Sequence, residues 1–420
     1  MKHFGAVCGP GASHVATMRA IGRELQVRGH QLSLFHLPDL ARPALTEISA
    51  SGPTERSTVS FANSRDASVA RTTGSTQDAF LHYMVKRARW ICENAPALLV
   101  AAKLDCLLVD ALDPATATVG EMLQIPYATI NNALPLNTEP LVPPDFLPWQ
   151  FHDNWWARLR NAFAYKVRDF LISPLNRTLN GYRRQWNLRP YRTPADSLSP
   201  LAQITQLVRE FDLPHTRLPK CFHYVGPYQR ESDAQHGFPY YQLNSRPLVY
   251  ASLGTRQSVH SPLWREISQS CAGLDVQLVI ALGNRNGSQS MSPLPGNPVV
   301  VDYAPQVDLL VRARLAILHG GLNSAMEALA AGVPMIILPL IGDQFGVAAR
   351  VAYTGAGVTI AGSRCRAIGL RPLIKTVLED SSYRKHAREL KLAINQTAGS
   401  RRAADILEEV AATRRPVLTH

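Results

Sequence analysis

The hydrophobic pattern at the start of the chain changes from strand to helix and back to strand. Residues 3–8 form a short apolar run, a stretch with helical spacing follows and ends at Gly29, and a second apolar run covers 31–35. The apolar stripe of the helix consists of Val15, Met18, Ile21 and Leu25. This order predicts a strand–helix–strand unit and therefore a parallel sheet.

The same alternation continues toward the C-terminus. Residues 106–109 form an apolar run that ends at Asp110, and a helical pattern then leads to Leu123 and to a strand over 127–130. Further strands are predicted at 248–253, 276–282, 299–301 and 315–318. Strands that alternate with helices in this way predict an α/β fold.

The pattern is interrupted once, between two stretches of α/β character. Residues 226–247 are rich in Gly, Pro, Ser and Gln and contain no periodic run, which predicts a linker. At 420 residues the chain has room for two domains of about 200 residues each. We expect a first domain over 1–225, a linker over 226–246 and a second domain over 247–400. The C-terminal helix, within 401–420, is expected to pack back on the first domain.

Composition and charge narrow the function classes. A content of 46% hydrophobic and 18% charged residues is typical of a globular protein and not of a disordered one. The net charge of +12 favours acidic partners, either nucleic acid or an anionic membrane. No DNA- or RNA-binding motif accompanies the charge, so we expect no nucleic acid. Peripheral contact with the inner face of the membrane stays open beside a merely basic enzyme.

Cysteine usage and apolar run lengths bear on the compartment. The six cysteines lie far apart, with no Cys-x-x-Cys pair and no histidine at metal spacing. This favours reduced thiols in a cytoplasmic protein and no zinc site. The N-terminal apolar run is too short for a signal peptide. The longest apolar stretch, 328–341, is broken by Gly332 and Pro334 and is too short to span a bilayer. We expect a soluble or membrane-peripheral protein.

The segment 319–344 holds the densest set of candidate functional residues. His319 and two adjacent glycines precede a helix that begins near Asn323 and Ser324. Glycines and small polar side chains let a phosphate approach the N–H groups at the positive end of a helix. Asp343 and Gln344 come after the following strand, at the edge where α/β folds bind ligands. A phosphate site so close to a hydroxyl-binding pair predicts a nucleotide-sugar site.

Two further strand ends offer polar groups to the same ligand. Ser252 and Thr255 flank a glycine and supply hydroxyl groups that suit a diphosphate. Tyr303, Ala304 and Gln306 follow another strand, where the ring can stack on a base and the amide can bind a ribose. Each segment alone also occurs in plain turns. All three together, in order and each after a predicted strand, form a specific combination.

The order of these segments resembles the family-1 UDP-glycosyltransferases over nearly the whole chain. The resemblance implies the GT-B fold, an α/β architecture of two facing Rossmann-like domains with a cleft between them. The second domain would bind the UDP-sugar. Tyr303, where the family often has tryptophan, would stack on the base beside Ala304.

The resemblance also implies roles for the remaining donor-side residues. Gln306 and Glu327 match the ribose contacts, and Asp343 and Gln344 match the pair that holds the sugar hydroxyls. The diphosphate contacts match Thr255, His319, Asn323 and Ser324, and the donor-binding set is completed by Ser252 and Gly321.

The first domain contributes a candidate base. His14 lies at the turn between the first strand and its helix, where a histidine also occurs as a capping or packing residue. The resemblance implies that His14 takes the proton from the acceptor hydroxyl, a task that suits the pKa of imidazole. Asp110 matches the partner that fixes its tautomer and stabilises the imidazolium. Asp113 is the competing carboxylate, and we prefer Asp110 because it directly follows the strand.

The chain contains no Asp-x-Asp pair, which metal-dependent sugar transferases use to hold a divalent ion. Neutralisation of the diphosphate then falls to the helix N-terminus near His319 and to hydroxyl donors. We expect no metal site, no cofactor besides the donor substrate UDP-glucose, and activity that survives a chelator. The reaction would be a single displacement with inversion at the anomeric carbon.

Segments outside the donor site bear on the acceptor. Residues 133–140 and 199–227, with both ends of the chain, resemble family members that glucosylate bacterial carotenoids. This implies transfer of glucose from UDP-glucose to the hydroxyl groups of zeaxanthin, giving the mono- and then the diglucoside, with another apolar alcohol as the alternative. The segment 155–171 mixes Trp, Phe and Tyr with Arg and Lys. It is predicted either as a membrane-interface helix or as a lid helix with its aromatics in the core.

Three other functions share parts of the pattern. The turn at 9–14 partly imitates a dinucleotide fingerprint, but its sixth position is His14 and no acidic residue ends the second strand. These departures disfavour a nicotinamide-dependent oxidoreductase. A nucleotide-sugar epimerase would not need His14 and Asp110 beside an apolar acceptor cleft. A sugar-binding module without catalysis would not need that pair at all.

Overall fold

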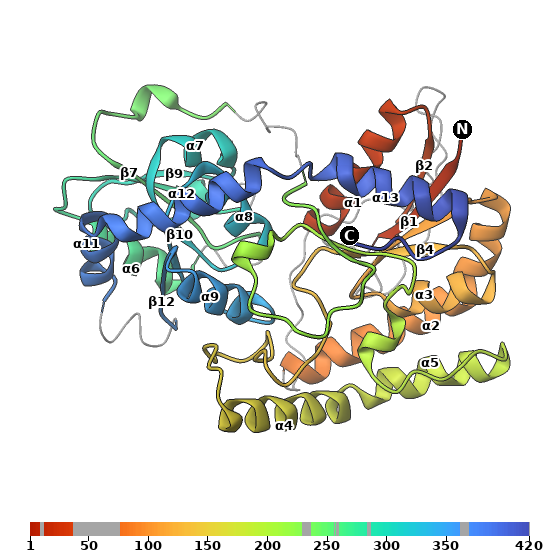
Figure 1. Ribbon diagram of the computed structural model, residues 1–420. Helices are drawn as coiled ribbons and strands as arrows, with labels where there is room; N and C mark the ends of the chain where they lie inside the picture. Colours follow the sequence, from red (N-terminus) through yellow and green to blue (C-terminus); the bar gives the residue numbers. More distant parts are fainter. Residues whose placement is uncertain are drawn as a thin grey trace.

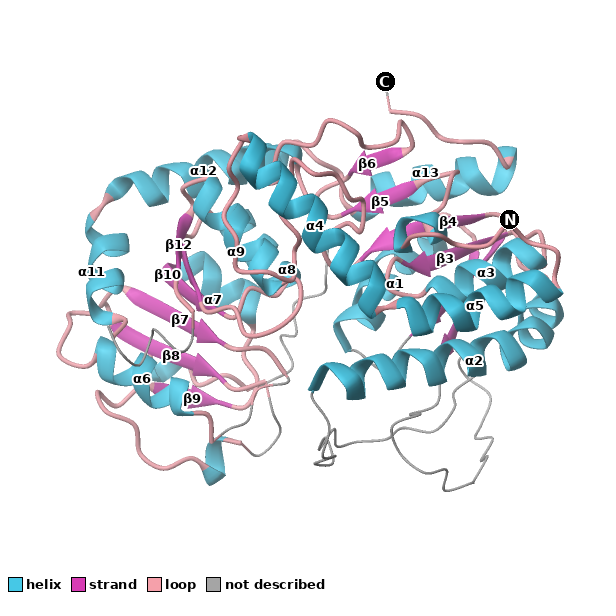
Figure 2. Ribbon diagram, turned by 90° about the horizontal axis from the view of Figure 1, so that it is seen from below, coloured by secondary structure: helices cyan, strands magenta, loops and turns pink. Residues whose placement is uncertain are grey.

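Two parallel β-sheets form the framework of the protein. The computed structural model describes residues 1–8, 12–36, 76–228, 237–255, 257, 260–283, 287–361 and 369–419. The turn at 9–11, residues 229–236 of the predicted linker and Cys365 lie outside the described residues. The two six-stranded sheets stand side by side, each with helices on both faces (Figure 1, Figure 2). The predicted α/β architecture with two facing domains is confirmed.

The first sheet has the strand order β2-β1-β3-β4-β5-β6. Its strands are β1 (His3–Cys8), β2 (Gln31–His36), β3 (Cys106–Asp110), β4 (Tyr127–Asn131), β5 (Gln203–Thr205) and β6 (Phe222–Tyr224). One face packs on α1 (Ala12–Val27) and α13 (Ser400–Thr413). The other packs on α2 (Thr76–Ala102), α3 (Pro114–Met122) and α5 (Ser173–Gln185). The C-terminal helix α13 therefore shares a hydrophobic core with the start of the chain.

The second sheet has the order β12-β11-β10-β7-β8-β9. Its strands are β7 (Leu248–Ser252), β8 (Gln277–Ala281), β9 (Val299–Val301), β10 (Ala313–Leu318), β11 (Met335–Ile337) and β12 (Gly357–Thr359). One face packs on α7 (Gln306–Arg312), α8 (Leu322–Ala331), α9 (Gln344–Tyr353) and α12 (Ser381–Asn395). The other packs on α6 (Pro262–Cys271) and α11 (Arg371–Glu379). Strands buried on both faces explain the continuous apolar runs in the sequence.

The carboxyl-terminal edges of the two sheets meet. Gly346 on α9, which follows β11, donates its backbone N–H to the carbonyl of Asp145 in the loop after β4, at 2.8 Å. Its close approach has a steric basis, because a Cβ at Gly346 would lie 2.6 Å from Leu134 and 2.8 Å from Asp145. Arg350 on the same helix pairs with Asp212 of the first half at 2.7 Å. The chain then crosses back through α12 and α13, which run over both halves (Figure 1).

The helix α4 (Trp155–Leu171) leads into α5 along the lower edge of the molecule as drawn in Figure 1. The side chain of Asn154 accepts from the backbone N–H of Ala157 at 2.8 Å and so caps its first turn. Its bounds coincide with the predicted amphipathic segment. Across the described ranges, no helix is both long and apolar enough to cross a bilayer.

Candidate active site

The parallel register of β1 and β3 brings His14 and Asp110 together. Phe4 pairs with Cys106 and Ala6 with Leu108, so the two strands end side by side. Asp110 is the last residue of β3, and His14 lies in the first turn of α1, directly after β1. Nδ1 of His14 contacts Oδ2 of Asp110. Two residues separated by 96 positions thus form a hydrogen-bonded pair at the carboxyl edge of the sheet.

Asp110 is fixed in place by further donors. Its Oδ1 accepts from the backbone N–H of Leu112 at 2.9 Å, and its Oδ2 accepts from Nδ2 of Asn132 at 2.9 Å. The residue is buried. Burial alone would raise the pKa of Asp110, but the hydrogen bonds and the charge of His14 outweigh it and hold the pKa below its usual value. Asp110 is therefore a carboxylate that can only accept hydrogen bonds at neutral pH.

The same contact tunes His14. Burial opposes its protonation, yet the hydrogen bond and the charge of Asp110 outweigh burial and raise the pKa of His14. Arg87 lowers this pKa and Asp343, from the second half, raises it. The side chain is 31% exposed. Because Nδ1 is turned to Asp110, Nε2 is the atom that can take a proton from a substrate.

Asp113, the competing carboxylate, has a different position. It caps α3, where its carboxylate accepts from the hydroxyl of Thr116 at 2.8 Å, and it pairs with Arg87 at 2.9 Å. These contacts explain Asp113 as a structural cap, whereas Asp110 contacts the histidine.

In the second half, His319 occupies a space that two glycines leave open. A Cβ at Gly254 would lie 2.8 Å from its Nε2, and a Cβ at Gly321 would lie 2.6 Å from the same atom. Gly254 also has a φ of +77°, which favours glycine. Burial lowers the pKa of His319 to about 4, so the ring is neutral at pH 7. Its Nδ1 is buried without a hydrogen-bond partner among the described residues, and the backbone of Ser252 lies close to the ring.

The start of α8 adds further polar groups beside His319. Gly321 is the N-cap residue and offers no side chain, which leaves the first N–H groups of the helix open to an anion. Oδ1 of Asn323 accepts from Nε2 of Gln206 in the first half at 2.6 Å. The same Gln206 nitrogen lies 3.4 Å from the backbone oxygen of Asn132. A polar chain therefore connects the Asp110 partner Asn132 with α8.

Gln306 and Glu327 also lie together, as the donor-site prediction requires. Nε2 of Gln306 donates to Oε2 of Glu327 and to the hydroxyl of Ser324, the latter at 3.2 Å. The hydroxyl of Tyr250 donates to Oε1 of Gln306 at 2.9 Å. Tyr303, which precedes this cluster, is 37% exposed. Ala304 is partly buried against the core, and Thr255 is exposed beyond Gly254.

Asp343 and Gln344 lie where the two halves meet. Oδ2 of Asp343 accepts from the backbone N–H of Leu134 at 3.3 Å. Burial, with the charge of Asp145, raises the pKa of Asp343 to about 6. Oε1 of Gln344 accepts from the backbone N–H of Leu340 at 2.8 Å, which leaves the amide nitrogen of Gln344 to donate elsewhere.

Sequence reasoning did not identify Arg87, Asn132 and Gln206, which contact the predicted residues. Asn132 had a usable signal, because an Asn-Asn pair follows the predicted strand 127–130. Arg87 and Gln206 had none. Within the described ranges, no cluster of three or more His, Cys, Asp or Glu side chains is arranged to hold a metal ion.

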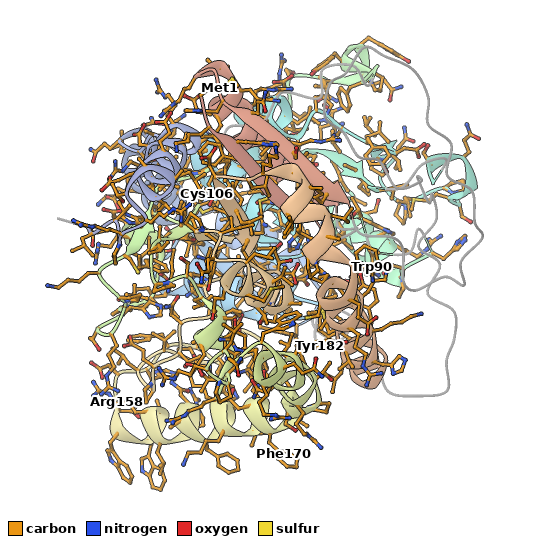
Figure 3. All side chains as sticks on the ribbon, turned by 90° about the vertical axis from the view of Figure 1, so that its right-hand side faces the viewer. Met1, Trp90, Cys106, Arg158, Phe170 and Tyr182 are labelled. Carbon is orange, nitrogen blue, oxygen red and sulfur yellow. The ribbon has the colours of Figure 1, made fainter. Side chains whose placement is uncertain are left out.

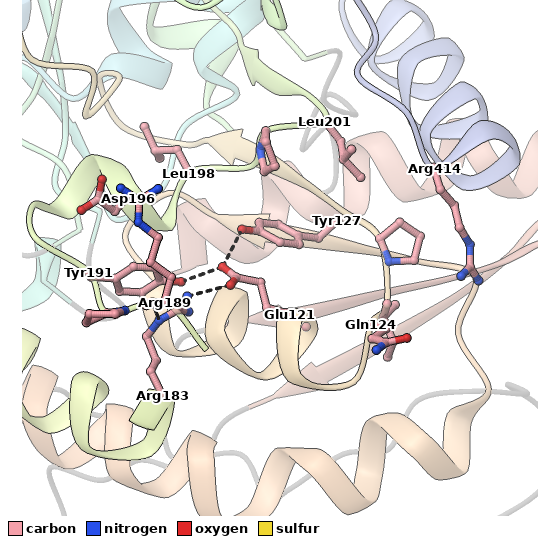
Figure 4. A pocket seen from close by; sticks show the side chains of 15 residues that line it. Glu121, Gln124, Tyr127, Arg183, Arg189, Tyr191, Asp196, Leu198, Leu201 and Arg414 are labelled. Carbon is pink, nitrogen blue, oxygen red and sulfur yellow. Dashed lines mark hydrogen bonds and ion pairs between the residues drawn. The ribbon is translucent and has the colours of Figure 1, made fainter. Parts of the chain in front are cut away.

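A cavity of about 510 Å³ lies elsewhere, between the end of α3 and the residues at and after the end of α5 (Figure 4). Arg183 and Glu121 pair there at 2.7 Å, and the hydroxyl of Tyr191 donates to Glu121 at 3.2 Å. The guanidinium of Arg183 also lies 3.7 Å from the centre of the Tyr191 ring. Of the lining residues, Arg183 and Glu121 are thus paired with each other, and none of the predicted site residues lines this cavity.

Comparisons with known proteins agree with this geometry. The sequence model of the family described as "UDP-glucoronosyl and UDP-glucosyl transferase" matches residues 7–395. The chain is 31% identical to the zeaxanthin glucosyltransferase of Pantoea ananas, covering 100% of this chain and 98% of the relative. It is also 31% identical to the zeaxanthin glucosyltransferase of Pseudescherichia vulneris, covering 98% of each. The solved calicheamicin glycosyltransferase CalG4 superposes with a TM-score of 0.72 at 19% identity, over 99% of this chain and 100% of that one.

Proposed function

Because the chain belongs to the UDP-glucuronosyl and UDP-glucosyl transferase family, we propose that it moves glucose from UDP-glucose to the hydroxyl groups of zeaxanthin. That it is a glycosyltransferase with the GT-B fold follows from the family match and the solved structures. The proposed mechanism rests on one observation above all. The hydrogen-bonded pair His14–Asp110 is within electrostatic reach of Asp343, the residue matched to the sugar, from the other half of the molecule.

In the proposed reaction, His14 is the general base. Nε2 of His14 takes the proton of the acceptor hydroxyl while the oxygen forms a bond to the anomeric carbon of glucose. The bond between that carbon and the diphosphate oxygen breaks, and UDP leaves with the electron pair. Asp110 stabilises the imidazolium formed in this step and keeps Nδ1 as its hydrogen-bonded nitrogen. A single displacement of this kind inverts the anomeric configuration.

The donor would lie along the carboxyl edge of the second sheet. We assign the diphosphate to His319, the N–H groups at Gly321, and the side chains of Asn323, Ser324, Ser252 and Thr255. A neutral His319 can donate a hydrogen bond to a phosphate oxygen without the cost of a buried charge. The helix dipole of α8 adds a favourable potential for the anion. This arrangement supports neutralisation without a metal, and we expect full activity in a chelator.

The rest of the donor has matching partners. The bonded pair Gln306–Glu327 suits the two ribose hydroxyls, because a carboxylate accepts and an amide both donates and accepts. Tyr303, exposed beside Ala304, offers a ring to the base. Asp343 and the free amide nitrogen of Gln344 suit the hydroxyls of glucose.

The choice of zeaxanthin is supported by the two zeaxanthin glucosyltransferases, to which this chain is similar over its full length. At 31% identity, a different apolar alcohol is the alternative acceptor. The five described cysteines carry free thiols. Such thiols support the cytoplasm as the compartment, at the inner face of the membrane that would hold a carotenoid diol.

Product analysis tests the proposal. The protein is incubated with UDP-glucose and zeaxanthin, and the products are resolved by mass. We expect zeaxanthin monoglucoside first, the diglucoside later, and one UDP released for each glucose transferred. Parallel reactions contain other UDP-sugars and a set of apolar alcohols. Faster transfer to another alcohol would replace zeaxanthin as the acceptor, and no glucoside from any acceptor would refute the proposed activity.

A further inference from the structure

The helix α4 presents its large apolar side chains to solvent. Their exposure ranges from 40% for Val167 to 77% for Phe170. The set consists of Trp155, Trp156, Leu159, Phe163, Val167, Phe170 and Leu171. At 100° per residue these positions fall within about half of the helix circumference. We call this set the α4 stripe.

The opposite face of α4 holds the helix on the protein with small and polar residues. Ala157, Asn161 and Ala164 are its buried positions. Nδ2 of Asn161 donates to the carbonyl of Pro140 at 2.9 Å, and the hydroxyl of Tyr165 donates to the carbonyl of Val142 at 3.1 Å. The usual arrangement of a surface helix is therefore inverted. A lid helix with its aromatics in the core is not what the structure shows.

Positive charge accompanies the α4 stripe. Residues 155–185 contain seven Lys and Arg residues and a single acidic residue, Asp169. Arg158 and Lys166 on α4 and Arg177 and Arg184 on α5 are exposed, and Arg158 pairs with the exposed Asp153 just before α4 at 2.6 Å. The helix forms the lower rim of the molecule, with Arg158 and Phe170 labelled toward its two ends (Figure 3). An apolar surface bordered by cations is complementary to an anionic bilayer, which offers acyl chains below a layer of phosphates.

We propose that the α4 stripe docks the protein on the surface of an anionic lipid bilayer, with α4 lying in the plane of the interface. Its length of about 25 Å allows several aromatic side chains to enter the boundary between headgroups and acyl chains at once. Tryptophan suits this depth because its ring is apolar and its N–H is polar. Lys166 would reach the lipid phosphates from among the apolar side chains, and Arg158 would do so from beside the stripe by exchanging its partner Asp153 for a phosphate.

Docking at this face connects the bilayer with the candidate active site. The loop 132–154 that α4 holds through Pro140 and Val142 also carries Leu134 and Asp145, which contact Asp343 and Gly346. If the acceptor is the apolar alcohol of the proposed function, on which this step rests, it would enter from the membrane along this loop. The docking itself does not depend on the identity of the acceptor.

Vesicle binding tests the docking directly. The whole protein is mixed with vesicles of phosphatidylcholine alone or of phosphatidylcholine with phosphatidylglycerol, and the bound fraction is measured by flotation. We expect binding to the anionic vesicles, weaker binding at high salt, and little binding to neutral ones. The stripe variant Trp156→Gln/Phe163→Gln/Phe170→Gln should bind at least about tenfold more weakly.

A matched variant controls for surface hydrophobicity in general. Val27, Val100 and Leu392 are equally exposed apolar residues on other helices, and their triple change to Gln should leave binding unchanged. Melting curves with and without UDP show that each variant is folded. Equal binding by the stripe variant and the wild type would overturn the proposal, as would absence of binding to anionic lipid. Stripe-dependent dimers in sedimentation velocity, without lipid binding, would make a second copy of the chain the occupant instead.

Discussion

The carboxylate of Asp110 accepts hydrogen bonds from His14, Leu112 and Asn132 while buried at the end of β3. Each bond stabilises its charge and restricts its rotation, so the orientation of the imidazole is set before a substrate arrives. The cost of burying the carboxylate is offset by these donors, and its pKa stays below the usual value. The site therefore contains a carboxylate, Asp110, that is fixed in position and accepts a hydrogen bond from His14, which can change its protonation state.

The pH dependence of kcat/KM should report His14. A base acts only when neutral, so activity falls as the pH drops through the raised pKa, and the acid limb should have its midpoint above 6.5. The Asp110→Asn variant loses the negative charge that raises the pKa of His14, while the burial that lowers this pKa remains. The midpoint should then move below that of the wild type, and kcat should fall by about 10²–10⁴-fold.

A second group titrates nearby. The pKa of Asp343 is about 6, and its carboxylate is ionised above that pH. The Asp343→Asn variant distinguishes the titration of Asp343 from that of His14, because the acid limb of kcat/KM that is due to His14 should persist in this variant. An acid limb that disappears in Asp343→Asn and is unchanged in Asp110→Asn would contradict the role given to His14.

Asn132 should act through Asp110 as a positioning residue. Removal of its donor in Asn132→Ala should lower kcat/KM by about 10- to 100-fold, the usual worth of a hydrogen bond to a charged group. The dissociation constant for UDP should not change, and the pH midpoint should shift. Asn137→Ala removes a nearby amide that bonds Gln203 instead and serves as the control. Equal kinetics for the two variants would remove Asn132 from the site.

At the scale of elements, the sequence predicts the long buried strands well. The expected runs 3–8, 106–109 and 127–130 agree with β1, β3 and β4, since strands covered on both faces need continuous apolar residues. The long helix α2 was not singled out, and its Pro96 is a residue that usually argues against a helix interior. The strands β5, β6 and β12 were not predicted, because each has three residues that mix apolar with polar or glycine positions, whereas the equally short β9 consists of three valines.

The candidate site was predictable where its residues are local. The glycines beside His319 were assigned to the approach of a phosphate, and the structure adds that one of them, Gly321, makes room for the ring together with the distant Gly254. Contacts between segments that are distant in the sequence could not be predicted from the spacing of residues. Gln206 bonds Asn323 across 117 positions, and only the packing of two domains creates that pair. The exposure of the aromatic side chains of α4 was likewise not predictable, because the composition of this helix suits both an apolar face toward the core and an apolar face toward solvent.

The helix α9 connects the loop at Leu134 and Asp145 of the first half with the candidate active site. It begins at Gln344 and packs its Gly346 against the loop at Leu134 and Asp145. Gly346→Ala should push the two apart, reduce stability by about 1–3 kcal/mol and lower kcat/KM by more than the melting shift explains. Gly181→Ala is the matched change in α5, where a Cβ meets nothing within 4 Å. If both variants behave like the wild type, α9 and the loop tolerate separation.

On the scale of the whole molecule, the two halves are joined by a buried ion pair. Nε and Nη2 of Arg350 lie 2.8 and 2.7 Å from Oδ1 of Asp212, and the hydroxyl of Tyr224 donates to Oδ2 at 2.8 Å. Burial opposes the charge of Asp212, but Arg350 outweighs it and holds the pKa of Asp212 below its usual value. The stability from this group is therefore present at neutral pH and lost on acidification through that low pKa.

Removal of one partner of the Arg350–Asp212 ion pair should lower the stability of the protein. Arg350→Met leaves the Asp212 carboxylate buried without its counter-ion, and should lower the free energy of unfolding by about 3–5 kcal/mol in urea titrations at neutral pH. Adding Asp212→Asn should recover part of that loss. Arg402→Met, at an exposed pair with Asp405, should cost about 1 kcal/mol or less. Similar losses at both pairs would mean that the junction is not held by Arg350.

The transferase activity is expected to depend on His14 of one half acting on a donor held by the other. The most direct test is the turnover of His14→Ala at saturating UDP-glucose and zeaxanthin, together with its dissociation constant for UDP-glucose by calorimetry. We expect a loss of about 10²–10⁴-fold in kcat with donor binding unchanged. Turnover close to that of the wild type, or a loss explained by weaker donor binding, would remove His14 from the role of base.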